Sequence, residues 1–297
     1  MSRFRLYPTP AQETALLGHC AQVRFGWNLA LEQANSDGTA GRKASPNFAA
    51  QCRQLTEARA EHQWLAAGSQ TVQQQARRDL DQAGRNFYGR THRRPTWRKA
   101  GRHEGFRIVG GPAGRVRRLN RRWAEVGVPK VGWVRFRLSR AIPDAKSYRV
   151  TRDSAGRWHI AFAAIPAAIP APGTGEVVGA DRGVAVSAAL ATGELRRFDT
   201  DSLDAQVRRT QRRLGRAQRG SHRRRRVKAR LARRHARRAD ARKDWVGKLS
   251  TDLARRFDLT ASFTIEVVER PGSRGGRSRP RPRRARLEPG CRLGHRR

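Results

Sequence analysis

The chain has 297 residues, and 65 lysine and arginine residues against 24 aspartate and glutamate residues give a formal net charge of +41. This net charge is far larger than that of an ordinary soluble enzyme. The positive side chains repel one another unless a polyanion neutralises them. Nucleic acid is therefore the first partner to consider. With 37% hydrophobic residues the chain can form folded cores, which excludes disorder throughout.

A polybasic membrane-surface protein is the competing interpretation, but the basic residues run along nearly the whole chain and not beside one anchor. The longest apolar stretch, residues 160–171, contains two prolines and is too short to span a bilayer. The first residues lack the apolar segment of a secretory signal, and Cys20, Cys52 and Cys291 make no disulfide framework. We expect a cytoplasmic, nucleoid-associated protein with no membrane and no small-molecule partner.

A strand and a helix start are indicated at the N-terminus. Residues 3–7 alternate between polar and apolar side chains as a half-buried strand does. Thr9 is a suitable N-cap, Pro10 suits the first helical position, and Gln12 completes a capping box. We therefore expect a helix from residue 10, which the apolar spacing carries to about residue 35.

The apolar period then changes from helical to strand-like. Spacings of three and four predict helices over 48–66 and 69–88. From about residue 105 the spacing is two, and such short strands joined by turns predict a small barrel or sandwich. These strands are expected over 106–108, 115–117, 133–137, 148–150 and 157–162.

A proline-rich linker over residues 166–173 precedes a third unit. This unit begins with an apolar strand over 176–183, and two shorter strands follow it up to residue 198. A long helical stretch over 203–256, hinged near Gly220, is crowded with arginine. These arginines form either a solvated surface or a nucleic-acid contact, and their density favours contact.

The last part of the chain changes character abruptly. A buried-type strand is expected over 263–268. Residues 271–297 then contain ten arginines, five glycines and four prolines, with almost no apolar side chains. Low-complexity sequence of this kind cannot build a core and is expected to be disordered.

Two carboxylates lie in otherwise apolar strands. Asp181 ends one such strand, and Glu266 interrupts the strand over 263–268. Ionised carboxylates in strands are costly unless they are paired or bound to a metal. If the two strands pack in parallel, both carboxylates reach one sheet edge, where they would hold Mg²⁺ for phosphodiester cleavage. The alternatives are a turn aspartate with an arginine-paired glutamate, and Glu269 in place of Glu266, although Glu269 faces the opposite side of a strand.

Short stretches between residue 3 and residue 268 form a recognisable series. They are FRLYPTPAQ from Phe4, RFGWN from Arg24, VPKVGWVR from Val128, GRW from Gly156, VGADRGV from Val178, RLGR from Arg213, KLST from Lys248 and FTIE from Phe263. In this order and spacing they resemble the TnpB family, the OrfB-type proteins of insertion sequences. Members of that family are RNA-guided DNA endonucleases with a RuvC-type nuclease domain.

The resemblance implies an α+β chain. A helical block is inserted into a small wedge-like β-barrel, and an incomplete RNase H-like (RuvC) α/β domain follows. It also implies a guide RNA and a double-stranded DNA target, with specificity supplied by guide pairing. The implied domains are a first barrel strand at 1–10, a helical nucleic-acid-recognition block at 11–104, the barrel at 105–172, a partial nuclease domain at 173–270 and the tail at 271–297.

The resemblance further assigns roles to individual residues. Asp181 and Glu266 become the two catalytic carboxylates and the Mg²⁺ ligands. Other matching residues become nucleic-acid contacts, at Arg5, Tyr7, Lys130, Arg135, Arg212, Arg213, Arg216, Arg223, Arg224, Arg230, Arg234 and Lys248.

The chain departs from the family pattern after Glu266. The family continues with a zinc ribbon built on two C-x-x-C pairs, and then with a third catalytic aspartate. Here Cys291 is the one cysteine in the last two hundred residues, no aspartate follows Asp258, and Glu288 stands in the low-complexity tail, so zinc ligands are missing. We interpret the tail as sequence read out of frame from about residue 269, with a genuine basic tail as the alternative.

This departure predicts a descendant of an RNA-guided endonuclease that no longer cleaves, because a two-metal nuclease without one carboxylate cannot hold its second ion. Mg²⁺ binding is then weak or absent. The alternative is a non-catalytic RNA- or DNA-binding protein that regulates its own element. A strand-joining transposase is disfavoured, because the sequence has no pair of histidines close to Tyr7, Tyr88 or Tyr148 that could support a tyrosine nucleophile. A ribosomal-type structural protein would explain the charge but not the carboxylates Asp181 and Glu266 in apolar strands.

Overall fold

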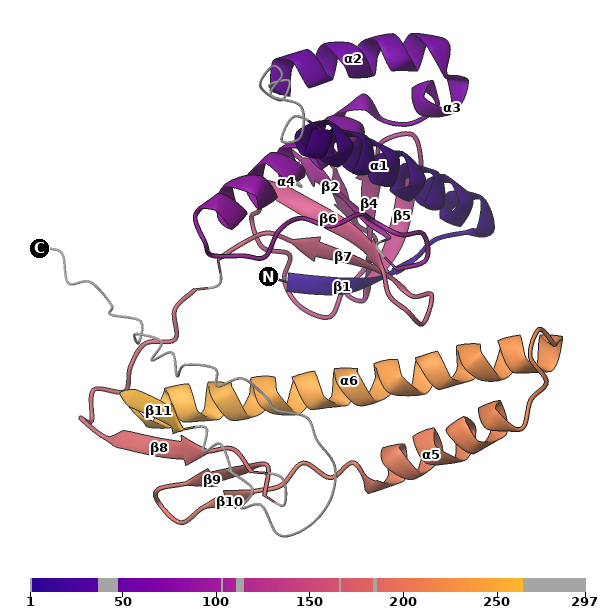
Figure 1. Cartoon of the computed structure of the whole chain (residues 1–297). Coiled ribbons are helices and arrows are strands. Elements are labelled where there is room, and N and C mark those ends of the chain that lie inside the picture. Colours follow the sequence, from indigo (N-terminus) through magenta and orange to yellow (C-terminus); the bar gives the residue numbers. More distant parts are fainter. Residues whose placement is uncertain are drawn as a thin grey trace, which may run out of the picture.

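The computed structural model describes residues 2–36, 48–102, 104–110, 115–165, 167–183 and 186–263. They form two bodies (Figure 1): a curled sheet with helices packed on it, and a smaller sheet with two long arginine-rich helices. Among these residues no helix combines the length and apolar character needed to cross a membrane.

The first body begins as the sequence predicts. Strand β1 (Ser2–Tyr7) leads into helix α1 (Pro10–Ser36). The capping box is formed: the backbone N–H of Thr9 donates to Gln12 Oε1 at 3.0 Å, and that of Gln12 donates to Thr9 Oγ1 at 3.3 Å. Gln12 Nε2 also donates to the carbonyl oxygen of Trp133 at 2.9 Å, which ties the start of the helix to the sheet.

The helix expected over 48–66 is interrupted. Helices α2 (Phe48–Glu61) and α3 (Gln63–Ala66) are separated by His62, whose extended backbone (φ −118°, ψ 102°) breaks the helical path. Helix α4 (Gln70–Tyr88) follows and packs along α1. The buried side chain of Gln73 joins these helices, because it donates to Gln22 Oε1 at 3.1 Å and accepts from Arg59 at 2.8 Å.

Seven strands form one antiparallel sheet in the order β2-β6-β7-β1-β5-β4-β3. The first strand of the chain, β1, therefore lies at its centre, between β7 and β5. The sequence pattern misses one strand, β4. The strands of this sheet that follow β1 are β2 (Gly105–Val109), β3 (Val116–Arg118), β4 (Trp123–Val128), β5 (Gly132–Arg137), β6 (Ser147–Arg152) and β7 (Trp158–Phe162).

The sheet curls into a half-barrel, which is an open form of the small β-barrel that the sequence predicts. Within the described ranges its two edge strands, β2 and β3, do not pair with each other. Leu16 of α1 and Val72 of α4 share one core with the inward-facing Phe4, Phe136 and Phe162 of the sheet. The helices therefore cover the inner face of the curled sheet.

The second body is a four-stranded sheet in the order β10-β9-β8-β11. Strands β8 (Val177–Asp181), β9 (Ala188–Leu190) and β10 (Leu195–Arg196) form an antiparallel meander. Helices α5 (Asp201–Gly215) and α6 (His222–Arg256) then cross over to β11 (Leu259–Phe263), which is parallel to β8. Leu253 and Phe257 pack against Val178 and Leu190 to form its small core.

Two expectations for this body concern its ends. The hinge near Gly220 is present: the glycine has φ 82°, and Ser221 caps α6 by accepting from the backbone N–H of Arg224 at 3.1 Å. A strand does form before Glu266, but it starts at Leu259, four residues earlier than expected. The remainder of the expected strand over 263–268, and the tail, lie outside the described residues.

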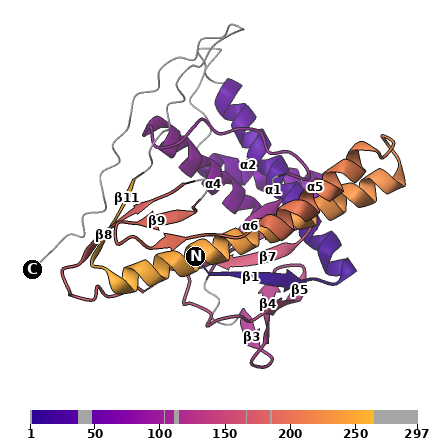
Figure 2. The same cartoon turned by 90° about the horizontal axis from the view of Figure 1, so that it is seen from below.

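Among the residues that the structure describes, an ion pair links the two bodies. Arg157, in the turn before β7, donates to Asp240 of α6 at 2.6 Å and to Asp153 of its own turn at 2.7 Å. Figure 2 shows α6 crossing the region of β1 and β7. Arg157 therefore holds helix α6 beside the sheet at one point along the helix.

Candidate nucleic-acid interface and carboxylate site

Aromatic and arginine side chains gather on the outer face of β1, β5, β4 and β3. Side chains alternate across a strand, so Arg5 and Tyr7 point away from the core. Tyr7 lies opposite Arg135 in the β1–β5 register, and its ring meets that of Trp123 edge-on at 5.2 Å. We call this group the sheet platform: Arg5, Tyr7, Arg117, Trp123, Trp133, Arg135 and Arg137.

Guanidinium groups cover the rings of the sheet platform. The guanidinium carbon of Arg117 lies 4.4 Å from the centre of the Trp133 ring, and that of Arg5 lies 5.5 Å from the centre of the Tyr7 ring. Tyr7 is 47% exposed and Trp133 is 38% exposed. Exposed rings between cationic groups can stack on unpaired bases while the charges hold phosphates.

Two neighbours set the charge of the sheet platform. Glu125 pairs with Arg117 at 2.7 Å and lies 3.8 Å from Arg135, so part of the positive charge is neutralised. Lys130 is exposed in the turn between β4 and β5, where its backbone has a positive φ of 63°. The structure thus brings Arg5, Tyr7 and Arg135 together and puts Lys130 at the end of the same hairpin.

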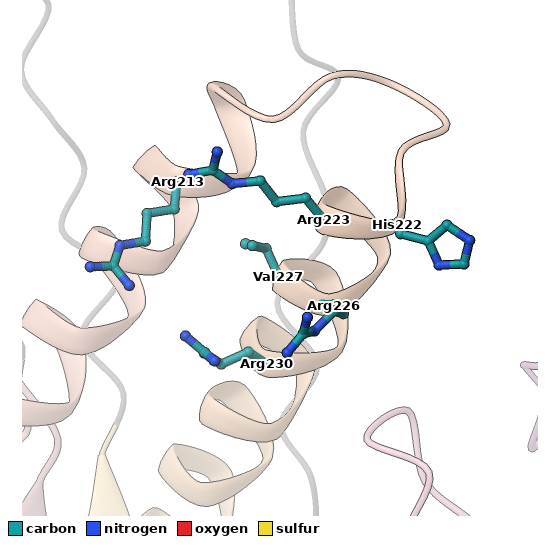
Figure 3. Close-up of a pocket in the computed structure, with 6 residues that line it drawn as sticks. All are labelled: Arg213, His222, Arg223, Arg226, Val227 and Arg230. Carbon is teal, nitrogen blue, oxygen red and sulfur yellow. The ribbon is translucent and has the colours of Figure 1, made fainter.

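A second basic surface lies at the tip of the α5–α6 hairpin. There a hollow of about 630 Å³ is open to solvent, and no acidic side chain of the described residues lines it. Figure 3 shows four arginines around Val227, while the ring of His222 points away. We call it the arginine hollow, lined by Arg213, Arg223, Arg226 and Arg230. Four guanidinium groups with no acid among them favour a phosphate-bearing ligand.

Two predicted contact residues are engaged inside the protein. Arg224 donates to two carbonyl oxygens at the end of α5, at 2.7 and 2.9 Å. Arg234 donates to the carbonyl oxygen of Gln206 and to the hydroxyl of Thr210. Their guanidinium groups hold α5 against α6, which leaves them fewer donors for a ligand.

The other predicted contacts on these helices are dispersed. Arg212 and Arg216 are exposed at the end of α5, beside the arginine hollow residue Arg213. Lys248 lies far along α6, paired with Asp244 at 2.7 Å, in a separate hollow that includes Arg140 of the first body. The structure does not bring Lys248 to the arginine hollow.

The sequence reasoning missed five residues of the two surfaces. Trp133 and Arg137 share the outer face of β5 with the predicted Arg135, and the two-residue period of the strand could have found them. Arg226 lies three and four residues from the predicted Arg223 and Arg230, a helical spacing that also places them together. Arg117 and Trp123 carry no comparable signal, because their strands become neighbours only through the sheet register.

Asp181 ends β8, opposite Phe263 of the parallel strand β11 and opposite Ala189 of β9. Its Oδ1 atom is buried and finds no hydrogen-bond partner in the described part of the chain. A carboxylate oxygen of this kind suits a hard cation such as Mg²⁺. Glu266 lies outside the described residues, and the others contain no group of three or more metal-binding side chains.

Two family models match this sequence. One, OrfB_IS605, is described as "Probable transposase" and matches residues 139–269. The other, HTH_OrfB_IS605, is described as a helix-turn-helix domain and matches residues 2–43, whose described part holds β1 and α1.

Two relatives align with most of the chain. "Putative RNA-guided DNA endonuclease InsQ" of Escherichia coli (strain K12) is 27% identical over 281 residues, which cover 92% of this chain and 68% of the relative. "Putative RNA-guided DNA endonuclease" of Streptomyces pristinaespiralis is 29% identical over 260 residues, which cover 85% of this chain and 63% of the relative. The chain thus spans about two thirds of the length of these relatives. Both matching models carry the OrfB_IS605 name and both relatives align across the two bodies, so the chain is similar to OrfB_IS605 transposases over most of its length.

Proposed function

We propose that this chain binds a guide RNA and a double-stranded DNA target, and that it descends from TnpB-type RNA-guided DNA endonucleases. The observation that carries the proposal is the arginine hollow, where four cationic side chains from two helices line one open hollow. The sheet platform supports it with exposed rings that suit unpaired bases. The names of the two relatives supply the RNA guide and the DNA target.

The carboxylate site belongs to the same proposal. Asp181 and Glu266 would hold Mg²⁺, which when bound activates water and stabilises the leaving oxygen of a phosphodiester. Two observations support this: the unpartnered Oδ1 of Asp181, and the parallel pairing of β8 with β11, the strand that leads toward Glu266. A meander followed by a helical crossover to a parallel strand is also the arrangement expected of an RNase H-like domain.

We further propose that the chain in this form is deficient in cleavage. The third aspartate that the resemblance implies has no match in residues 259–297, which hold Glu266, Glu269 and Glu288 as their acidic residues. One metal ion would then lose part of its ligand set. The same feature favours the second candidate function, a non-catalytic nucleic-acid-binding protein that regulates its own element.

The experiment measures the affinity of the full chain for a structured RNA and for double-stranded DNA between about 50 and 200 mM salt. The Arg213→Ala/Arg226→Ala variant should bind more weakly, and the slope of log affinity against log salt should shrink by about two units, because each lost phosphate contact removes about one. The control, Arg53→Ala/Arg93→Ala, removes the same charge from exposed positions outside both surfaces. Equal slopes for the two variants would show that the arginine hollow does not contact the nucleic acid.

The cleavage part of the same experiment adds Mg²⁺, a guide RNA and a matched DNA target. We expect binding without cuts, in the parent chain and in Asp181→Ala alike. Specific, Mg²⁺-dependent cuts that disappear in Asp181→Ala would overturn the proposed deficiency and establish an active nuclease.

A further inference from the structure

A separate pocket of about 410 Å³ lies on the helical block, between α1, α2 and α4. Figure 1 places these helices on the far side of the first body from α5 and α6. Leu31 and Leu80 form apolar walls, and Tyr88 stands at the mouth with 83% of its surface exposed. We call this the helical pocket. Its size and mixed lining are those of sites for small, flat organic groups.

Gly84 lies in the wall of the helical pocket. It lies inside helix α4, where glycine costs about 1 kcal/mol of helix stability relative to alanine. A Cβ atom built at this position would meet nothing within 4 Å, so packing inside the protein does not require the glycine. Gly84 also lines the pocket, and its missing side chain enlarges the space available to a ligand.

Polar groups in the lining suit the hydrogen-bond donors of a nucleobase. Gln51 is 6% exposed, and its Oε1 atom is without a hydrogen-bond partner among the described residues. Asp81, one turn before Arg85 on α4, adds carboxylate oxygens to the wall. Both side chains offer acceptors, and the amino groups of adenine, guanine and cytosine are donors.

Cationic groups stand beside these acceptors. Arg85 and Arg94 line the helical pocket and are exposed, and the part of the chain that the structure describes gives neither an acidic partner within 4 Å. Arg94 donates to Asn35 at 2.8 Å, which fixes its guanidinium group at the mouth. A ligand that fits must therefore join a flat, donor-bearing ring to a negative group.

We propose that the helical pocket takes up one unpaired nucleotide of a bound nucleic acid strand. The base enters between the apolar walls over Gly84 and contacts Tyr88, and its phosphate lies at Arg85 and Arg94. This inference rests on the proposed function, because it assigns a further subsite to nucleic acid that the chain binds elsewhere.

The test uses the full chain and a short single-stranded RNA carrying one 6-thioguanosine, with a DNA of the same sequence carrying 6-thio-2′-deoxyguanosine, because 6-thioguanine keeps an amino donor. Ultraviolet light crosslinks these bases to side chains in contact with them, and mass spectrometry of the peptides locates the crosslink. We expect crosslinks at Phe87 or Tyr88 of α4. Gly84→Leu, which fills the helical pocket, should lower their yield about tenfold, the effect of losing one stacked base, while the contacts elsewhere on the chain still hold the strand.

Gly18→Leu is the matched control, since Gly18 is a helical glycine of α1 that also meets nothing within 4 Å but does not line the pocket. Tyr88→Ala is a second variant that should fold normally because its side chain is exposed, and it should lower crosslinking to the remaining pocket residues. If one of the two probes crosslinks to the pocket and the other does not, the proposal is supported, and the result shows whether the bound strand is RNA or DNA. Binding without crosslinks in α4, or crosslinks unaffected by Gly84→Leu, would overturn it, whereas no binding of either strand would overturn the proposed function as well.

Discussion

Asp153 organises the turn between β6 and β7. Its Oδ1 accepts from the backbone N–H groups of Ala155 and Arg157 at 2.9 and 2.8 Å. Burial alone would raise the pKa of Asp153, but hydrogen bonds from Arg157 and His159 outweigh burial and lower that pKa to about 2. Because the folded state binds the proton less tightly than the unfolded state, ionised Asp153 stabilises the fold above about pH 4.

Replacing Asp153 by asparagine should therefore weaken the fold in a pH-dependent way. The pKa falls from its ordinary value of 3.8 to about 2, which after solvent screening of this partly exposed carboxylate corresponds to about 1–2 kcal/mol of stability at pH 7. This contribution is lost as the pH falls through about 4 to 2, so the difference in unfolding free energy between parent and Asp153→Asn should roughly halve at pH 3. Urea unfolding at the two pH values measures it. A difference that is unchanged with pH would show that the charge of Asp153 is not what stabilises the turn.

Single residues also show how far a sequence reveals a site. The motif residues Arg5, Tyr7 and Arg135 do meet on one surface, because alternation fixes the face on which each side chain lies. Arg224 and Arg234 look identical to their neighbours in an arginine-rich helix, yet they bond to α5. Sequence cannot separate such arginines from exposed ones, since the partner atoms belong to a helix whose position is set by tertiary packing.

Helix α6 illustrates the same point for whole elements. It has 35 residues, and Leu253 is its one buried side chain, so apolar packing holds it mainly at the end near β8 and β11. Toward its start the contact with α5 depends on arginine donors bonded to backbone and hydroxyl oxygens. Thr210, which accepts from Arg234, is 2% exposed.

Removing Arg234 should loosen α5. In Arg234→Ala the carbonyl of Gln206 and the hydroxyl of Thr210 lose a charged donor, and such bonds contribute about 1.5–3 kcal/mol. Amide hydrogen exchange in residues 201–215 should therefore quicken by about tenfold or more. Arg233→Ala removes an equal charge from the exposed side of α6 and should leave exchange unchanged. If both variants exchange alike, charge and not the bond controls the helix pair.

The elements that the sequence predicts well are those with local signals. The start of α1 follows from its capping box, and the turn at Gly220 follows from the glycine. Strand β4 escapes prediction because its buried face includes the small Ala124 and its outer face includes Gly127, neither of which favours strands. Strand β11, with the sequence LTASF, is a strand only because β8 offers it a parallel partner.

The whole molecule carries its +41 charge in two bodies joined by the ion pair of Arg157 with Asp240. Self-repulsion of this size opposes compaction, and a bound polyanion relieves it. The arginine hollow and the sheet platform lie on different bodies, so one long nucleic acid that contacts both would also resist their separation.

Nucleic acid should accordingly raise the thermal stability of the full chain. At an RNA concentration a hundred times its Kd, mass action stabilises the folded state by about 2.7 kcal/mol. A rise in Tm measured by scanning calorimetry checks this, and the rise should shrink as salt increases. Dextran, an uncharged polymer, is the control for crowding. An equal rise with dextran would contradict a role for charge.

The central position of β1 has a consequence for how the protein is made. β1 is synthesised before its partners β5 and β7, which follow only after the entire helical block. At about 5–20 residues per second, Phe4 and Leu6 wait on the order of ten seconds for the strands beside them. Helices α1 and α4 form from nearby residues and contribute to the core that holds both side chains. The helical block thus gives the nascent strand β1 its first apolar packing partners, which reduces its exposure to aggregation.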